Sequence, residues 1–158
     1  MNEHGLRQIE DLIEKLRTES IDAIYTSDLS RSLTTAEAIG KRFALPPIKV
    51  PELREIDFGD WEGLSWTEIE SRDQAYARRW SEAYPELPAP GGETFGAFRC
   101  RVLSKINDLL AASSRSCAAV VTHAGVIRVV LRSLCGLEER EAWEQTRAYC
   151  GFFRYQAR

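Results

Sequence analysis

Apolar and polar residues alternate along the whole chain with two spacings, one typical of helices and one of strands. Between residues 5 and 17 the apolar side chains recur at i, i+3 and i+4, which predicts a helix with one buried face. Asn2 stands before this segment as the expected N-cap. The run 21–26 is too short for another such helix, and its apolar residues favour a strand.

The same reading extends to the end of the chain. The pattern predicts further strands at 48–50, 118–122 and 149–155. It predicts further helices at 65–71, 73–83, 94–112 and 125–134, and one more that ends near Phe43. The run Ala118 to Thr122 is continuously apolar, so we expect a strand buried on both faces. Ser27 and Asp28 are the expected capping residues of the helix that runs to about Phe43.

Strands that alternate with helices indicate an α/β fold, and here we expect a three-layer α/β/α sandwich with a mainly parallel sheet. No repeat or low-complexity linker divides the sequence, so residues 1–158 are expected to form a single domain. In sheets of this kind the binding crevice lies at the carboxyl ends of the strands. Side chains that directly follow a strand are therefore the first candidates for a functional site.

Composition and charge narrow the classes of function. The formal net charge is −3, whereas a nucleic-acid surface needs clustered Lys and Arg. The sequence contains no run of 18 apolar residues, so we expect no membrane span. None of the four cysteines forms a C-x-x-C pair, which disfavours a zinc knuckle or a thioredoxin motif. The polar N-terminus lacks the apolar stretch of an export signal, which favours free thiols and a cytoplasmic location. The sequence contains two histidines, which leaves little material for a His-rich metal site, so we expect no bound metal.

The first candidate is Arg31, in the turn from residue 25 to residue 31. It stands at the start of a helix that follows a strand, where N–H groups and the helix dipole favour an anion. A guanidinium group adds two parallel hydrogen bonds to a phosphoryl group. A solvated surface arginine is the alternative interpretation, and position alone does not decide between the two.

The second candidate is His123, which follows the apolar strand directly. An imidazole at this place can donate a hydrogen bond to a phosphoryl oxygen or transfer a proton. A buried structural histidine bonded to backbone is the alternative. Two further motifs are a charged loop over residues 53–63 and the turn Pro90-Gly91-Gly92-Glu93, for which a turn before a helix is the simpler interpretation.

The charged loop contains several carboxyl groups among aromatic residues. A carboxyl group beside apolar rings can act as a general acid, but spacing does not choose among Glu55, Asp57, Asp60 and Glu62. A solvated charged loop is the simpler interpretation for any one of them. The four tryptophans are expected to pack in a core or at its rim.

Taken in order, four segments resemble the histidine phosphatase superfamily of the phosphoglycerate-mutase-like type. The segment 27–37 resembles the family's S-D-L-x-R-x-x-x-T-A-E motif, and 53–63 resembles its L-x-E-x-x-x-G-x-W-E-G loop. The segment 90–93 resembles its P-G-G-E turn. The segment 120–128 resembles its V-V-[ST]-H-x-G-V-I-R motif. The match therefore extends over most of the sequence.

The resemblance implies a function and a role for three residues. It implies a phosphomonoester hydrolase that works through a phosphohistidine and acts on a small phosphorylated metabolite without a metal or cofactor. Arg31 would bind the phosphoryl group, His123 would stabilise its charge, and Glu55 would be the general acid. The compact middle region resembles the small phosphatases, with the α-ribazole phosphatases as the nearest branch.

One motif of the family is absent from this sequence. The family begins with a strand that ends in R-H-G, whose histidine is the nucleophile, and no R-H-G occurs here. The segment 2–8 fits a later family motif that opens the first helix, so we assign His4 to that helix and not to the nucleophile. We therefore expect a truncated domain that lacks its first strand, with the nucleophile encoded upstream of Met1 and this chain impaired in catalysis.

Two alternatives stay open at this stage. The chain could be a non-catalytic protein that binds phosphate esters or a partner and has lost the catalytic histidine. An open gap in the sheet would leave room for a partner chain, such as a second copy in a homodimer. A dinucleotide-binding domain is disfavoured because no G-x-G-x-x-G follows a strand.

Overall fold

The computed structural model describes residues 2–113 and 116–156, which form two compact units. The first unit combines Met1–Glu55 with Val102–Arg158, and the second is Ile56–Arg101. The strands are β1 (Ala23–Thr26), β2 (Pro47–Lys49) and β3 (Ala118–Val121). The helices are α1 (Glu3–Lys15), α2 (Ser30–Phe43), α3 (Trp66–Arg72), α4 (Gln74–Ala83), α5 (Phe95–Ala112), α6 (Ala124–Leu134) and α7 (Glu139–Gln145). Two short 3-10 turns, η1 (Pro51–Leu53) and η2 (Gly59–Trp61), lie between β2 and α3.

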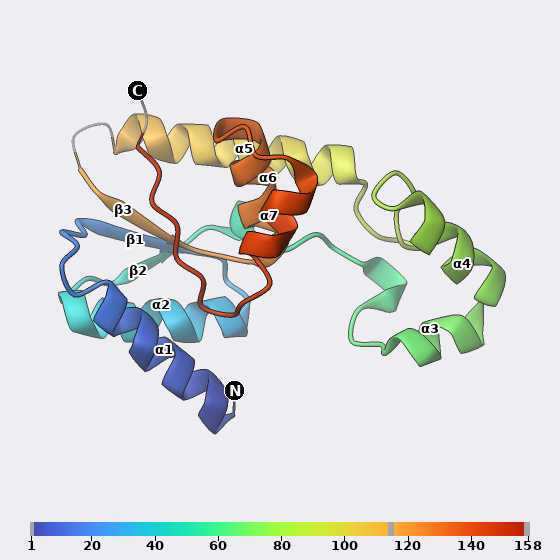
Figure 1. Ribbon diagram of the computed structural model, residues 1–158, viewed down its shortest axis with the longest axis horizontal. Coiled ribbons are helices and arrows are strands. Elements are labelled where there is room, and N and C mark those ends of the chain that lie inside the picture. Colours follow the sequence, from blue (N-terminus) through green and yellow to red (C-terminus); the bar gives the residue numbers. More distant parts are fainter. Residues whose placement is uncertain (1, 114–115, 157–158) are drawn as a thin grey trace. The chain divides into compact units, whose positions relative to one another are not determined.

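The first unit is built on a three-stranded parallel sheet of order β2-β1-β3. Tyr25 in the central strand stands opposite Ile48 on one side and Val120 on the other. In Figure 1, α1 and α2 cover one face of this sheet, and α5 and α6 lie over the other. The α/β class and the parallel sheet predicted from the sequence are confirmed.

The sheet and the two N-terminal helices share a core. Leu12 and Leu16 of α1 pack with Ile24 of β1 and with Ala36 and Ile39 of α2. These five side chains are at most 7% exposed. The predicted N-cap of α1 is confirmed, because the side chain of Asn2 accepts a hydrogen bond from the backbone of Gly5. The spacing of apolar residues in α1 and α2 thus determines which face of each helix is buried.

Three features differ from the sequence predictions. The side chains of β3 are only partly buried, because β3 forms an edge of the three-stranded sheet among the described residues. The strand predicted at 149–155 is wrong for the described residues, since 151–156 form no strand and Tyr149 is 83% exposed. Aromatic residues favour strands, but a strand needs a neighbour for its backbone hydrogen bonds. Helix α7 was not predicted, although a capping box at Glu138 and Glu141 marks its start.

The second unit is organised around aromatic rings that meet edge to face. Trp61 and Trp80 meet edge to face with 5.2 Å between their ring centroids, and Tyr76 approaches Trp61 in the same way at 6.0 Å. Ile69 and Ala77 are buried beside them. The prediction that these tryptophans pack in a core or at its rim is confirmed for this unit.

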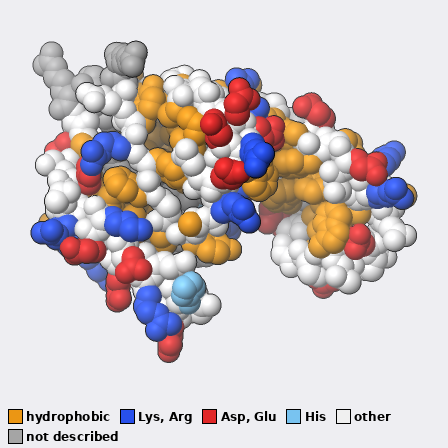
Figure 2. All heavy atoms as spheres, viewed as in Figure 1, with side chains coloured by type: hydrophobic (Ala, Val, Ile, Leu, Met, Phe, Trp, Pro, Cys, Tyr) orange, Lys and Arg blue, Asp and Glu red, His pale blue; other side chains and the backbone are white. Residues whose placement is uncertain are grey.

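The surface shows mixed charge. Figure 2 shows Lys and Arg side chains interspersed with Asp and Glu over the visible face, without a large area of one sign. In the described part of the chain, no helix combines the length and the apolar character needed to cross a bilayer.

Candidate active site

The site begins where two neighbouring parallel strands end together. Thr26, the last residue of β1, stands opposite Val121, the last residue of β3. The backbone N–H of Ser27 donates to the carbonyl of Val121 across 3.3 Å, so the pairing continues one residue beyond β1. The residues that follow each strand therefore emerge at the same edge of the sheet.

Arg31 and His123 meet at this edge. Arg31 lies in the first turn of α2, and its Nε donates to Nδ1 of His123 across 3.2 Å. The other ring nitrogen, Nε2, lies 2.7 Å from Oγ of Ser27. Arg31 is exposed, whereas His123 is 7% exposed and Ser27 is fully buried. The imidazole is thus held from inside the protein, and the guanidinium approaches it from the solvent side.

Buried hydroxyl groups fix the turn that carries Arg31. Oγ of Ser32 donates to the carbonyl of Val121 across 2.8 Å and lies 2.9 Å from Oγ1 of Thr26. Thr26 and Ser32 are both buried. These bonds attach the start of α2 to the end of β3, which holds Arg31 beside the residue that follows that strand.

Glu55 reaches the same region from a third segment. The hydroxyl of Thr122 donates to the carbonyl of Leu53 across 2.7 Å, which holds the end of η1 against the residue before His123. The carboxylate of Glu55 then accepts a hydrogen bond from the backbone nitrogen of Gly125, with 3.0 Å between Oε2 and N. Gly125 lies two residues after His123, in the first turn of α6. The structure thus brings Glu55 to the helix that His123 precedes.

Asp28 and Arg54 form an ion pair that joins these segments. Nε of Arg54 donates to Oδ1 of Asp28 across 2.6 Å, and a second nitrogen of Arg54 contacts the other carboxylate oxygen. The hydrogen bonds from Arg54 hold the pKa of Asp28 below its ordinary value. This pair ties the turn after β1 to the segment that ends in Glu55.

The N-terminal cap of α2 differs from the prediction. Ser27 and Asp28 were expected to cap the helix, but its N-cap is Leu29, and no side chain makes the capping bond. The two polar side chains instead bond to His123 and Arg54. These partners lie far away in the sequence, so local spacing gave no sign of them. Only the position of Ser27 and Asp28 at a strand end, where α/β sites form, pointed to a role.

The other carboxyl groups of the charged loop have local roles in the second unit. Asp57 accepts from the backbone of Gly59 across 2.8 Å, and Glu62 accepts from the backbone of Phe58 across 3.0 Å. Both bonds close turns within this loop. The backbone carbonyl of Asp57 also accepts from the N–H of Glu93 across 2.8 Å. The charged loop and the Pro90–Glu93 turn therefore form one backbone-bonded structure.

His4 lies apart from these contacts. His4 is the second residue of α1, which begins at Glu3, and its side chain is exposed. The assignment of His4 to the start of the first helix is confirmed by the bounds of α1.

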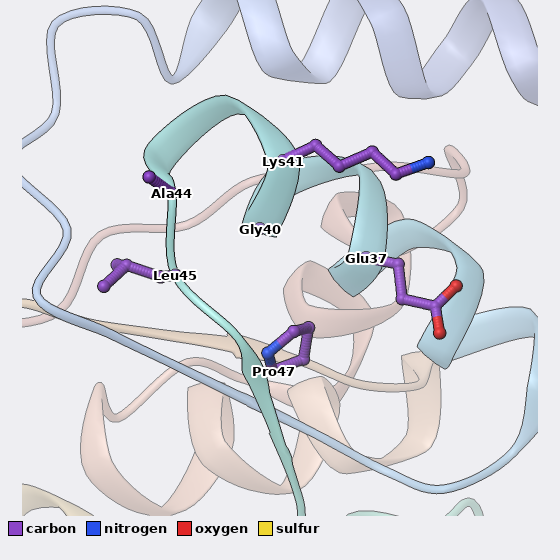
Figure 3. A pocket seen from close by; sticks show the side chains of 6 residues that line it. All are labelled: Glu37, Gly40, Lys41, Ala44, Leu45 and Pro47. Atoms are coloured by element: carbon purple, nitrogen blue, oxygen red, sulfur yellow. The ribbon is translucent and has the colours of Figure 1, made fainter.

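A separate depression lies at the other end of α2 (Figure 3). Its volume is about 330 Å³. Its lining residues are Glu37, Gly40, Lys41, Ala44, Leu45 and Pro47. Lys41 is ten residues beyond Arg31, which corresponds to roughly 15 Å along a helix. The depression is therefore distinct from the contacts around His123. In the described residues no group of three or more His, Cys, Asp or Glu side chains is placed to hold a metal ion.

Comparison with known proteins supports the relationship implied by these motifs. The chain is 35% identical over 134 residues to the metal-independent phosphoserine phosphatase of Arabidopsis thaliana, covering 82% of this chain and 56% of that protein. It is 30% identical over 139 residues to the adenosylcobalamin/alpha-ribazole phosphatase of Escherichia coli, covering 88% of this chain and 68% of the relative.

A solved structure gives the same relationship. The alpha-ribazole phosphatase of Shigella flexneri superposes with a TM-score of 0.81 at 28% identity, covering 90% of this chain and 71% of that one. The chain thus spans between about half and about two thirds of the length of these relatives. The family described as the histidine phosphatase superfamily (branch 1) matches residues 1–156. On this evidence the chain belongs to the histidine phosphatase superfamily, branch 1.

Proposed function

We propose that this chain carries the phosphate-binding part of a phosphomonoester hydrolase. The observation that carries the proposal is the contact between Arg31 Nε and His123 Nδ1, 3.2 Å apart at the carboxyl ends of adjacent parallel strands. A guanidinium and an imidazole at this distance can share one phosphoryl group as hydrogen-bond donors. Their place at the strand ends agrees with the usual position of sites in parallel sheets.

Each of the three residues has one role in the proposed reaction. A nucleophilic histidine attacks the phosphorus atom, and the bond from phosphorus to the alcohol oxygen breaks. Arg31 and His123 stabilise the charge on the transferring group, and Glu55 gives its proton to the departing oxygen. Water then attacks the phosphohistidine, and the Glu55 carboxylate takes up the proton that water releases.

The nucleophile is not one of these three residues. We propose that it is the histidine of an R-H-G segment, which the 158 residues do not contain. In that case hydrolysis by the 158-residue chain is lower by a factor on the order of 10⁴–10⁶ than hydrolysis by a chain with the segment. The second candidate function, non-catalytic binding of phosphate esters, needs only Arg31 and His123, which are in contact in this chain.

Two observations support a proposed substrate class, the donors Arg31 and His123 and the names of the relatives. Two donors on one anion fit a phosphomonoester, and the relatives named above act on phosphoserine or on alpha-ribazole phosphate esters, as their names state. We propose a small phosphorylated metabolite as substrate, and an α-ribazole phosphate monoester as its specific form.

Phosphate binding by the 158-residue chain tests the proposal. Calorimetry with inorganic phosphate should show binding that Arg31→Ala weakens roughly tenfold to a hundredfold, because hydrogen bonds to charged groups contribute about 1.5–3 kcal/mol. Arg78→Ala is the matched control, since Arg78 is an exposed arginine of α4 that pairs with Glu82. A wild-type chain that binds no phosphate, or an affinity that Arg31→Ala leaves unchanged, would contradict the proposal.

Hydrolysis of p-nitrophenyl phosphate separates the two candidate functions. The reading frame upstream of Met1 is sequenced, and the chain extended through any R-H-G found there is assayed beside the 158-residue chain. Turnover by the extended chain that Glu55→Gln lowers supports the hydrolase. An upstream frame without R-H-G favours the non-catalytic function. Turnover by the 158-residue chain that His4→Ala abolishes would instead make His4 the nucleophile.

A further inference from the structure

Ser27 makes a close contact with the candidate phosphate-binding histidine. Its Oγ lies 2.7 Å from Nε2 of His123, at the short end of the range for hydrogen bonds between nitrogen and oxygen. We propose that Ser27 is a positioning residue that fixes the tautomer and the ring orientation of His123, so that Nδ1 is the nitrogen presented with Arg31 to a phosphoryl oxygen. The phosphate part of this inference rests on the proposed function.

The hydrogen-bond directions around the imidazole determine its tautomer. A guanidinium nitrogen can only donate, so Nδ1 of His123 accepts from Nε of Arg31 through its lone pair. A neutral imidazole carries one proton, which therefore resides on Nε2. Ser27 Oγ is then the acceptor of the Nε2 proton. The serine hydroxyl is the group that stabilises this tautomer.

The same arrangement remains suitable when an anion binds. A phosphoryl oxygen accepts hydrogen bonds, so His123 must offer it an N–H. The ring acquires that proton on Nδ1, while Nε2 keeps its proton and its bond to Ser27. The oxygen of Ser27 therefore accepts from the neutral ring and from the imidazolium alike, and the ring does not need to turn between the two states.

The backbone holds Ser27 in the orientation that this role needs. Its N–H donates to the carbonyl of Val121 across 3.3 Å, which ties it to the strand that leads into His123. Ser27 is fully buried, so water does not compete for its hydroxyl. The neighbouring hydroxyl of Ser32 has a different partner, the carbonyl of Val121 at 2.8 Å. Two buried hydroxyl groups thus lie on the same turn, and one of them contacts the imidazole.

Ring-nitrogen NMR of the 158-residue chain tests the proposal directly. The sequence contains two histidines, and exposed His4 serves as an internal reference for an imidazole in water. The spectrum is recorded well above the ordinary imidazole pKa of about 6.5, and His4→Gln assigns the signals. We expect Nε2 of His123 to give the shift of a protonated nitrogen and Nδ1 that of an unprotonated one. A wild-type ring protonated on Nδ1 would overturn the proposal without any variant.

Substitutions then assign the effect to the serine hydroxyl. In Ser27→Ala we expect the two ring shifts of His123 to move toward a mixture of tautomers, and inorganic phosphate to bind roughly tenfold more weakly. Ser27→Thr keeps a hydroxyl and should restore the wild-type ring shifts. Ser71→Ala, the matched control, removes an exposed hydroxyl of α3 that donates to the carbonyl of Glu68, and it should change neither the shifts nor the affinity by more than about twofold.

Two outcomes distinguish this inference from the proposed function. If Ser27→Ala folds and keeps the wild-type ring shifts of His123, Ser27 does not set the tautomer and the inference is wrong. If the wild-type chain binds no phosphate, the proposed function fails, yet the ring shifts still decide the role of Ser27. If Ser27→Ala does not fold, the wild-type spectrum and Ser27→Thr decide it.

Discussion

The carboxylate of Glu55 lies 3.0 Å from the backbone nitrogen of Gly125, in the first turn of α6. The N-cap of this helix is His123, whose side chain makes no capping bond. Glu55 thus satisfies one of the N–H groups that a helix start leaves open. The candidate acid of the reaction is therefore also a stabilising partner of α6.

Gly125→Ala should destabilise the protein through this contact. A Cβ at Gly125 would overlap a carboxylate oxygen of Glu55 and lie 2.9 Å from its carboxyl carbon. In a helix the substitution would otherwise be favourable by up to about 1 kcal/mol. The carboxylate is the end of a flexible side chain and can move aside, so the cost is the hydrogen bond to the Gly125 backbone; we expect the free energy of unfolding, measured in urea, to fall by no more than about 1 kcal/mol.

The Glu55→Ala background provides the control for that change. Without the carboxylate, Gly125→Ala meets no such obstacle, so helix propensity alone should determine its sign. We expect Gly125→Ala to be neutral or stabilising there. Equal destabilisation in both backgrounds would show that the glycine is required for another reason.

The ion pair of Asp28 and Arg54 should make stability depend on pH. Because Arg54 lowers the pKa of Asp28 in the folded protein, this pair contributes stability above the unfolded-state pKa and loses it as the pH falls through the folded-state value. The loss therefore begins below about pH 4. We expect wild type to exceed Asp28→Asn in free energy of unfolding at pH 7, with the difference shrinking toward pH 3. A difference independent of pH would contradict this assignment.

Two glycines of the charged loop allow a matched comparison. Gly59 and Gly63 both have positive φ, +53° and +75°, so alanine at either position is strained by about 1–2 kcal/mol. A Cβ at Gly59 would also overlap the backbone of Gly91 and Gly92, whereas a Cβ at Gly63 meets nothing within 4 Å. Gly59→Ala should therefore destabilise the second unit distinctly more than Gly63→Ala, as measured by thermal unfolding. Equal effects would mean that the charged loop and the Pro90–Glu93 turn can move apart with little loss of free energy.

The sequence predicted the site where local rules apply. A strand followed by a helix start located Arg31 and His123, because parallel strands end at one edge of a sheet. The spacing of apolar residues predicted α1, because a helix at the surface buries one face. The alternation of strands with helices predicted the parallel sheet. The choice of Glu55 among four carboxyl groups came from the family resemblance, and the spacing of residues alone left it open.

Long-range partners could not be predicted in this way. Ser27 and His123 are 96 positions apart, and nothing in either segment identifies the other. The expected strand at 149–155 failed because strand propensity is realised only when a neighbour accepts the backbone hydrogen bonds. Cys150 instead has φ of +54° and packs partly against the core formed by α1, β1 and α2.

Cys150 should be the slowest of the four thiols to react. Burial raises the pKa of its thiol, whereas Cys100, Cys117 and Cys135 are exposed. Since the thiolate is the nucleophile, a higher pKa and lower exposure both slow alkylation. Mass spectrometry after timed treatment with iodoacetamide at pH 8 should show the exposed cysteines modified first, and all four at similar rates after unfolding in urea. Early modification of Cys150 in the folded protein would contradict its packing against the core.

Arg128 should hold α6 and α7 together in a way that lysine cannot replace. Its guanidinium carbon lies 3.4 Å from the ring centroid of Trp143, and its Nε donates to Oγ1 of Thr146 across 2.8 Å. A planar guanidinium can stack on the indole and donate within its plane at the same time, whereas an ammonium group cannot. We expect Arg128→Lys to lower the free energy of unfolding by about 1–2 kcal/mol. Arg132, which is also in α6, lies 3.6 Å from Glu139 and serves as the control. Arg132→Lys should change the free energy of unfolding by less than about 0.5 kcal/mol. If Arg128→Lys is as stable as the wild type, charge alone accounts for the contact and stacking contributes nothing.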